Sequence, residues 1–262
     1  MEARTVTSFQ QALIRSRQLE QNAPCRLRCA SGTDVRGWIA LVAQRGKLGL
    51  SEREAMTRAW AMVSAVNPFP ATLGRICPHP CEDACSRSAK DGAVAVNALE
   101  RFLGDWGLEQ RLRLPRLEKK NAQPESIGVI GAGPAGLSFA YQMARRGYRV
   151  TVYEKEKKPG GMLYHGIPQY RLPEHVLEAE IMRILDLGVD LKLEVAVGRD
   201  LAVPQLRAWH NVVFLGIGAG KGIKLDIPQE NGPAVWTGTE YLAKINRGEA
   251  LALGNEVVIV GG

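Results

Sequence analysis

Three glycines in one turn form the first candidate site for chemistry. Gly131, Gly133 and Gly136 follow the apolar run Ile127 to Ile130, and they open a helical pattern that starts at Pro134. This G-x-G-x-x-G spacing allows a tight strand-to-helix turn and a close approach of the backbone to a pyrophosphate. The helix N-terminus that follows offers free N–H groups and the positive end of its dipole to phosphates.

An acidic residue follows the second predicted strand, which is the position where a dinucleotide-binding turn requires one. The apolar run Val150 to Tyr153 predicts a second strand, and it ends on Glu154, which can accept hydrogen bonds from a ribose diol. An ordinary βαβ unit without a ligand is the alternative. Strand, glycines, helix, strand and acid in this order predict a dinucleotide site.

The five cysteines form two short clusters, Cys25-x3-Cys29 and Cys77-x3-Cys81-x3-Cys85. Disulfides are disfavoured in a chain without a secretion signal, and structural zinc usually shows tighter Cys-x2-Cys pairs. Loops wrapped around a larger inorganic core tolerate these longer spacings. The spacing therefore favours an iron–sulfur cluster over zinc, with free buried cysteines as the remaining alternative.

Composition limits the other classes of function. The 262 residues are 45% hydrophobic and 23% charged, as in a globular protein of one or two domains. The net charge of +7 is scattered without a basic stripe, so we expect no nucleic-acid function. The sequence contains neither a signal-peptide core nor a run of membrane-spanning length, so we expect a cytoplasmic protein without membrane insertion.

The chain before residue 111 has helical patterns. Asp34 and Ser51 are candidate N-caps, and Ser51 with Glu54 makes a capping box. Val94 to Trp106 predicts a further helix. Arg111 to Pro124 is charged and lacks a sustained apolar pattern. The predicted division is therefore a helical domain over 1–118, a linker over 119–125 and a Rossmann-like domain over 126–262.

Two further strands are predicted in the second domain. Val212 to Leu215 precedes a glycine-rich turn, and Glu256 to Val260 precedes Gly261 and Gly262. The last two glycines read as the start of a second nucleotide-binding motif, so we expect the two-nucleotide fold to be incomplete in this chain.

Several stretches resemble one known family. NAPCRLRCASGTDVRGWIALVA, NPFPATLGRICPHPCEDAC and VAVNALERFLGD resemble the iron–sulfur domain of the glutamate synthase small (beta) subunit family, which includes the N-terminal part of dihydropyrimidine dehydrogenase. GVIGAGPAGLSFA, KPGGMLYHGIPQYRLP and VVFLGIGAGKGIKLDIPQE resemble its FAD domain. The resemblance implies an α+β two-domain fold, all-α and then Rossmann-like. It also implies an electron path between NAD(P)H, FAD and a [4Fe–4S] cluster that serves a partner subunit.

The same resemblance implies a set of FAD-binding residues. Glu154 would hold the adenosine ribose, Val197 would meet adenine, and the segment from Gly161 to Arg171 would pass the flavin. Ile217 replaces a family threonine, and a packing role is expected for His165, so no catalytic residue is assigned. The implied FAD-binding residues are Gly131, Gly133, Pro134, Ala135, Gly136, Glu154, Lys155, Gly161, Met162, Leu163, Gly166, Ile167, Arg171, Val197 and Gly218.

The resemblance also implies the cluster ligands. One cluster would take Cys29, Cys77, Cys81 and the carboxylate of Glu100. A second would take Cys25, Cys85 and two family cysteines that are replaced here by Arg17 and Glu20. Arginine has no lone pair to offer, so we predict a single cluster. A rival arrangement recruits Cys25 or Cys85 in place of Glu100.

Two functions remain open from sequence. One is an NAD(P)H-dependent flavin and iron–sulfur oxidoreductase subunit, whose nicotinamide binds through a region beyond this chain. The other is an FAD and [4Fe–4S] electron-transfer and assembly module that never meets nicotinamide. Under the first, we expect the isolated chain to oxidise NAD(P)H poorly, because hydride transfer needs nicotinamide positioned against flavin.

Overall fold

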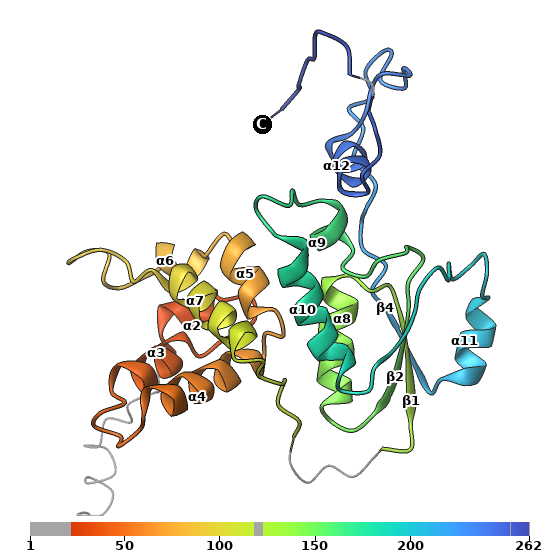
Figure 1. The fold of residues 1–262 in the computed structure, drawn as a ribbon. Helices are drawn as coiled ribbons and strands as arrows, with labels where there is room; N and C mark the ends of the chain where they lie inside the picture. The colour runs from red at the N-terminus through yellow and green to blue at the C-terminus, as the bar shows by residue number, and fades with distance from the viewer. Residues whose placement is uncertain (1–21, 118–122, 252, 262) are drawn as a thin grey trace, which may run out of the picture.

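The computed structural model describes residues 22–117, 123–251 and 253–261. Its first part is helical (Figure 1). The helices of this part are α2 (Pro24–Arg28), α3 (Val35–Ala43), α4 (Glu52–Ser64), α5 (Pro70–Ile76), α6 (Pro80–Asp83) and α7 (Val96–Glu109).

The second part is built on a parallel sheet of four strands in the order β3-β2-β1-β4. The strands are β1 (Ser126–Ile130), β2 (Arg149–Tyr153), β3 (Asp190–Lys192) and β4 (Val212–Leu215). The helices are α8 (Pro134–Ala144), α9 (Met162–His165), α10 (Glu174–Leu185), α11 (Val203–Trp209) and α12 (Gly238–Asn246). Because β1 lies between β2 and β4, the glycine turn after β1 opens at the centre of the sheet edge.

The predicted helix starts are confirmed. An Asp34 side-chain oxygen accepts a hydrogen bond from the Gly37 N–H at 3.1 Å, and Ser51 with Glu54 forms the reciprocal capping box. The further helix predicted over Val94 to Trp106 is displaced toward the C-terminus. It begins at Val96 and continues to Glu109 as α7, since its apolar face extends over α5 and α4.

The two parts share one hydrophobic core. α8 and α10 lie between the sheet and the helical part, whereas α11 packs on the other side of the sheet (Figure 1). The Tyr141 hydroxyl donates a hydrogen bond to the Ser64 carbonyl at 2.7 Å, which joins α8 to α4. The shared core includes Trp38, Trp60 and Leu103 from the first part and Leu137, Tyr141 and Ile181 from the second.

The predicted strand from Glu256 to Val260 is wrong. This segment has no regular secondary structure, and Val258 is 87% exposed. A strand pattern forms a strand only when a neighbouring strand satisfies its backbone groups, and the segment pairs with no other strand of the described chain. Among the described helices, none is long and apolar enough to cross a membrane.

Candidate cofactor sites

The three glycines of the turn after β1 have different neighbours. Gly131 has φ +99°, and a Cβ there would lie 2.5 Å from the Gly216 carbonyl oxygen. A Cβ at Gly136 would overlap the Gly131 carbonyl oxygen. A Cβ at Gly133 would meet only the Gly161 Cα, at 3.9 Å. The fold itself thus requires glycine at positions 131 and 136, whereas space is open in front of the backbone at Gly133.

A second glycine turn packs against the first. The Gly160 N–H donates to the Ala132 carbonyl at 2.7 Å, and Gly160 and Gly161 both have positive φ, +121° and +53°. A Cβ at Gly161 would lie 2.8 Å from the Gly133 Cα. The segment predicted to pass the flavin therefore begins on the predicted pyrophosphate turn, in a backbone conformation that glycine adopts without cost.

Glu154 ends β2 beside the same turn, and its side chain is buried at 6% exposure. One carboxylate oxygen accepts the Ala132 N–H at 2.7 Å, and the other accepts the Glu156 N–H at 3.0 Å. A carboxylate has about four acceptor sites, so lone pairs remain for a ribose diol. The Val195 N–H donates to the Glu154 carbonyl at 2.9 Å, which brings the chain toward Val197.

These residues fit a dinucleotide. α8 has Gly133 as its N-cap with no side-chain cap bond, and Pro134 is its first residue. The N–H groups of its first turn have no intrahelical partners and are the groups that bind phosphate oxygens. The acid at the ribose position disfavours a 2′-phosphate and suits a free diol.

The other predicted FAD residues lie at varying distances from this turn. Leu163 is buried in α9, and Met162 folds over Gly166. Val197 pairs with Leu201 in an isolated bridge. Lys155, Arg171 and Gly218 are exposed, and none of the described interactions joins them to the glycine turn.

Asn246, at the end of α12, is a site residue that sequence reasoning missed. Its side-chain amide is buried and donates to the carbonyls of Tyr164, His165 and Ile167 at 2.9, 3.2 and 3.0 Å. One side chain therefore fixes the backbone of the predicted flavin segment. No sequence signal marks it, because its partners lie about 80 residues earlier in the chain.

His165 lies beside Tyr164 in an edge-on ring contact, with 5.0 Å between ring centroids. Burial lowers the pKa of His165 from its ordinary value, and neither ring nitrogen has a hydrogen-bond partner in the described structure. The sequence analysis expects a packing role for His165, and this ring contact is consistent with that role.

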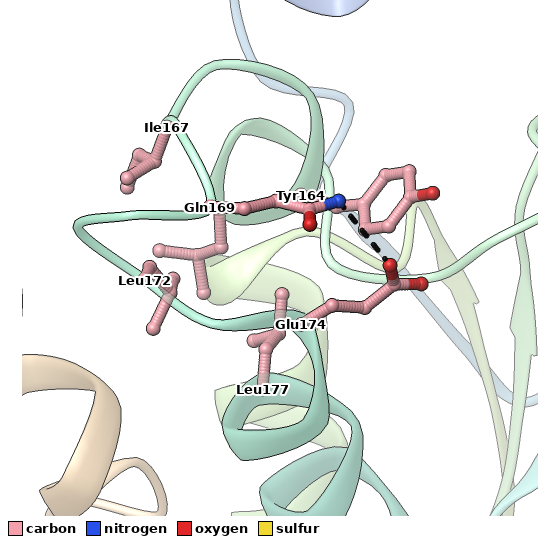
Figure 2. Close-up of a pocket in the computed structure, with 7 residues that line it drawn as sticks. Tyr164, Ile167, Gln169, Leu172, Glu174 and Leu177 are labelled. Carbon is pink, nitrogen blue, oxygen red and sulfur yellow. Dashed lines mark hydrogen bonds between the residues drawn. The ribbon is translucent and has the colours of Figure 1, made fainter. Parts of the chain in front are cut away.

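Figure 2 shows a small hollow between this segment and α10. Tyr164, Ile167 and Leu172 line it, and Gln169 reaches Glu174 across it at 3.4 Å. Its volume of about 10 Å³ has room for about one water molecule. A cofactor ring therefore does not fit there.

The second candidate site is formed where α2 packs against α6. Cys29 ends α2, Cys77 ends α5, and Cys81 lies in α6. Burial, together with the neighbouring Cys29 and Cys77, raises the pKa of Cys81 to about 11. A bound cationic iron–sulfur core would favour the thiolate form that burial and these neighbours disfavour at Cys81.

The loop around Cys77 suits a sulfur ligand. His79 has φ +46°, and its N–H donates to the Cys77 Sγ at 3.3 Å. Hydrogen bonds to ligand sulfurs are one of the means by which proteins tune iron–sulfur clusters. This donor set of clustered thiols with an N–H···S bond fits the predicted cluster.

Glu100 lies on α7, one turn beyond the point where α7 meets α6. The Asn97 N–H donates to a Glu82 carboxylate oxygen at 2.7 Å, which fixes that junction. One Glu100 oxygen accepts from the Asn67 side chain at 2.8 Å, and burial raises the pKa of Glu100. This bond leaves the second oxygen of Glu100 for another partner.

The remaining predicted metal residues differ in their surroundings. Cys25 packs against the small cluster of Val35, Cys81 and Val96. Backbone N–H groups, that of Val94 foremost, lower the pKa of Cys85. Arg17 and Glu20 lie outside the described residues. Within the described part, no three Cys, His or acidic side chains are grouped to hold a metal ion, whereas cluster ligands surround a larger inorganic core.

Sequence comparisons divide the chain in the same order as the fold. Residues 9–112 match the family described as dihydropyrimidine dehydrogenase domain II, 4Fe-4S cluster. Residues 129–184 match the NAD(P)-binding Rossmann-like domain family. The helical iron–sulfur part followed by a Rossmann-like part, as predicted, is therefore confirmed.

Curated relatives align with nearly the whole chain. The NADPH-Fe(3+) oxidoreductase subunit beta of Geobacter sulfurreducens is 31% identical over 92% of this chain and 35% of its own length. The dihydropyrimidine dehydrogenase subunit PreT homolog of Salmonella typhi is 32% identical over 92% and 56%. The glutamate synthase [NADPH] small chain of Azospirillum brasilense is 31% identical over 91% and 50%.

The chain is therefore a homologue of these NAD(P)-dependent oxidoreductase subunits, and the predicted family resemblance is confirmed. It spans between about a third and a little over half of the length of these relatives. A solved structure of Mycobacterium tuberculosis FprA in complex with NADPH covers 47% of this chain and 29% of its own at 19% identity, with a TM-score of 0.43. That likeness is too low to carry an argument.

Proposed function

We propose that the chain binds FAD at the glycine turn and one [4Fe–4S] cluster at Cys29, Cys77, Cys81 and Glu100. It passes electrons between NAD(P)H, FAD and the cluster, to or from a partner subunit. The observation that carries the proposal is the convergence of the Gly131–Gly136 turn, the Gly160–Gly161 turn and Glu154 at one edge of the sheet.

FAD is favoured over NADP at this turn by charge and by space. Glu154 disfavours a 2′-phosphate. The second glycine turn suits a planar ring lying against the backbone, where a Cβ would intrude. When bound, FAD accepts or delivers hydride and electrons. The chain's own residues hold its pyrophosphate on α8, its ribose on Glu154 and its ring beside the Gly161 segment.

The partner proposal rests on the relatives. The relatives named above are a beta subunit, a PreT subunit homolog and a small chain. The beta subunit of an NADP(+)-dependent formate dehydrogenase from Moorella thermoacetica is 33% identical over 92% of this chain and 36% of its own length. We therefore propose a larger redox protein as partner and the cytoplasm as location. The predicted domain division at 119–125 also remains part of the proposal.

The test is anaerobic reconstitution of the chain with FAD, iron and sulfide, followed by rapid mixing with NADH or NADPH. The oxidoreductase subunit predicts slow bleaching near 450 nm, the flavin band, in the isolated chain, and bleaching at about 1–1,000 per second once a protein that supplies a nicotinamide-binding domain is added. Flavin and cluster that bind but do not respond to nicotinamide even with that domain added favour the electron-transfer module. A folded chain that binds neither cofactor contradicts both functions.

A further inference from the structure

Two charged residues of α10 are buried between the sheet and the helical part, and neither belongs to the predicted cofactor ligands. Glu180 is fully buried and Arg183 is 8% exposed. They stand three residues apart on α10, so they face the same side of the helix. Burying a charge is costly unless it is paired and hydrogen-bonded, so the partners of these two side chains are informative.

Glu180 holds the start of α5. Its two carboxylate oxygens accept the N–H groups of Ala71 and Thr72 at 2.8 and 2.9 Å. These are first-turn donors that an α-helix cannot satisfy itself, and the positive end of the helix dipole favours a carboxylate. α5 has no side-chain cap from its own N-cap residue, Phe69. Glu180 therefore supplies this cap from a helix more than a hundred residues later.

Arg183 holds the end of α7. Its guanidinium donates to the Gly107 carbonyl, and its central carbon lies 5.1 Å from the centroid of the Trp60 ring. A cation suits the carbonyl end of a helix, just as an anion suits the N–H end. Each of the two buried charges is therefore matched in sign to the helix end that it contacts.

The two helices that α10 holds are two of the four helices that carry or precede predicted cluster ligands. α5 runs directly into Cys77, and α7 carries Glu100. At the other end of α10, the Leu177 side chain packs on the Gly160 turn and lines the hollow under Tyr164. A single helix thus contacts the predicted flavin segment in its first turn, α5 in its second turn through Glu180 and α7 in its third turn through Arg183.

We infer that Glu180 and Arg183 are a clamp that sets the position of the iron–sulfur cluster relative to the flavin. They are positioning residues for electron transfer between the two centres, and this inference rests on the proposed function. Electron transfer slows steeply as two centres move apart. The reduction potential of a cluster also depends on its solvent exposure and hydrogen bonding. Loosening α5 and α7 therefore changes both the rate of electron transfer and the reduction potential of the cluster.

The alternative is that Glu180 and Arg183 only stabilise the packing of α10 against α5 and α7. Glu180 and Arg183 bond to backbone groups of α5 and α7. The double variant Glu180→Leu with Arg183→Met keeps apolar packing at both positions and removes both helix-end bonds. Its cluster spectrum and transfer rate, measured beside its stability, therefore separate the two roles.

The first experiment compares Glu180→Gln with wild type and with Glu178→Gln in the full chain loaded with FAD and iron. Glu178 is on the same helix but exposed, where it lies 3.4 Å from Lys158. We expect Glu180→Gln to speed hydrogen exchange at Ala71 and Thr72 about ten-fold or more, since bonds to a charged group are lost. We also expect an altered paramagnetic resonance spectrum of the reduced cluster and several-fold slower flavin-to-cluster transfer at unchanged flavin and iron content.

A folded Glu180→Gln chain with wild-type exchange, spectrum and transfer rate overturns the clamp. If that variant fails to fold, the double apolar variant decides. In a folded double variant with wild-type flavin and iron content, an altered cluster spectrum and slower transfer support positioning, and a wild-type spectrum and transfer rate overturn it. A wild-type chain that binds neither cofactor contradicts the proposed function instead, and the exchange rates at α5 still report whether Glu180 holds that helix.

Discussion

Gly133 differs from its two companions in what a side chain would meet. A Cβ at Gly131 or Gly136 would collide with backbone carbonyls, whereas a Cβ at Gly133 would meet no atom closer than 3.9 Å. Substitution at Gly133 therefore tests the ligand space and leaves the protein core alone.

We expect Gly133→Val to abolish FAD binding while the chain stays folded, since the added methyl groups occupy the proposed pyrophosphate position. Absorbance near 450 nm after reconstitution measures the flavin, and far-ultraviolet circular dichroism measures the fold. Gly46→Val is the matched control, because Gly46 lies in an exposed turn of the helical part with no atom within 4 Å of its added Cβ. A yellow Gly133→Val protein would contradict the assigned site.

His210 gives a pH dependence whose sign can be worked out. Its Nε2 lies 2.9 Å from the Tyr153 hydroxyl oxygen, and burial lowers its pKa. As the pH falls through about 6.5, the unfolded chain takes up a proton that the folded chain resists, so stability falls. Burial lowers the pKa of His165 too, so His165 also makes stability fall as the pH falls.

We therefore expect the loss of melting temperature between about pH 7.5 and about pH 5.5 to be smaller in His210→Gln than in wild type. His175→Gln is the control, since His175 is exposed on α10, and it should keep the wild-type loss. Equal losses in the wild type and His210→Gln would show that His210 does not contribute.

At the scale of elements, helices that do not carry cofactor ligands position the segments that do. α12 fixes the 164–167 backbone through Asn246, and Arg247 at its end pairs with Glu156 at 3.2 Å. α10 supports the same segment from beneath through Leu177. The predicted flavin segment is thus held between two helices that follow it in the chain.

We expect Asn246→Ala to destabilise this segment by about 1–3 kcal/mol, because buried carbonyls lose their donor. Hydrogen exchange over residues 160–171 should become faster, and flavin affinity should fall without loss of the fold. Asn231→Ala is the control, since Asn231 contacts Lys224 in the exposed 221–235 loop. Unchanged exchange over 160–171 in Asn246→Ala would remove Asn246 from the site.

At the scale of the whole molecule, the two parts behave as one packed body. Trp60 and Leu103 share a core with Leu137 and Ile181, and Tyr141 bonds to Ser64 across the junction. The thiols of the helical part are thereby fixed relative to the glycine turn. Such an arrangement suits electron transfer between two centres in one chain.

The number of clusters is a property of the whole chain. Anaerobically reconstituted protein should contain about four irons per chain rather than about eight, because Arg17 and Glu20 stand where the second cluster would need cysteines. Glu100→Ala should lose or alter the cluster. Eight irons would contradict the single cluster, and an unchanged spectrum in Glu100→Ala would move the fourth ligand to Cys25 or Cys85.

The sequence by itself determined the features that depend on neighbouring residues. Each of these features depends on residues only a few positions apart. They are the glycine spacing, the Asp34 and Ser51 caps and the strand Val212 to Leu215. Periodicity and capping are local properties, so they can be read from a single chain. The strand pattern of Glu256 to Val260 failed because a strand also needs a partner.

Only the tertiary structure decided which distant residues meet. Glu180 caps a helix that begins 110 residues earlier (180 − 70), Asn246 fixes a segment about 80 residues earlier, and the Gly160–Gly161 turn packs on Gly133. A buried polar side chain must find partners somewhere, but local sequence does not say where. Chain folding brings those partners together, because burying the shared apolar core places α10 and α12 against elements that precede them.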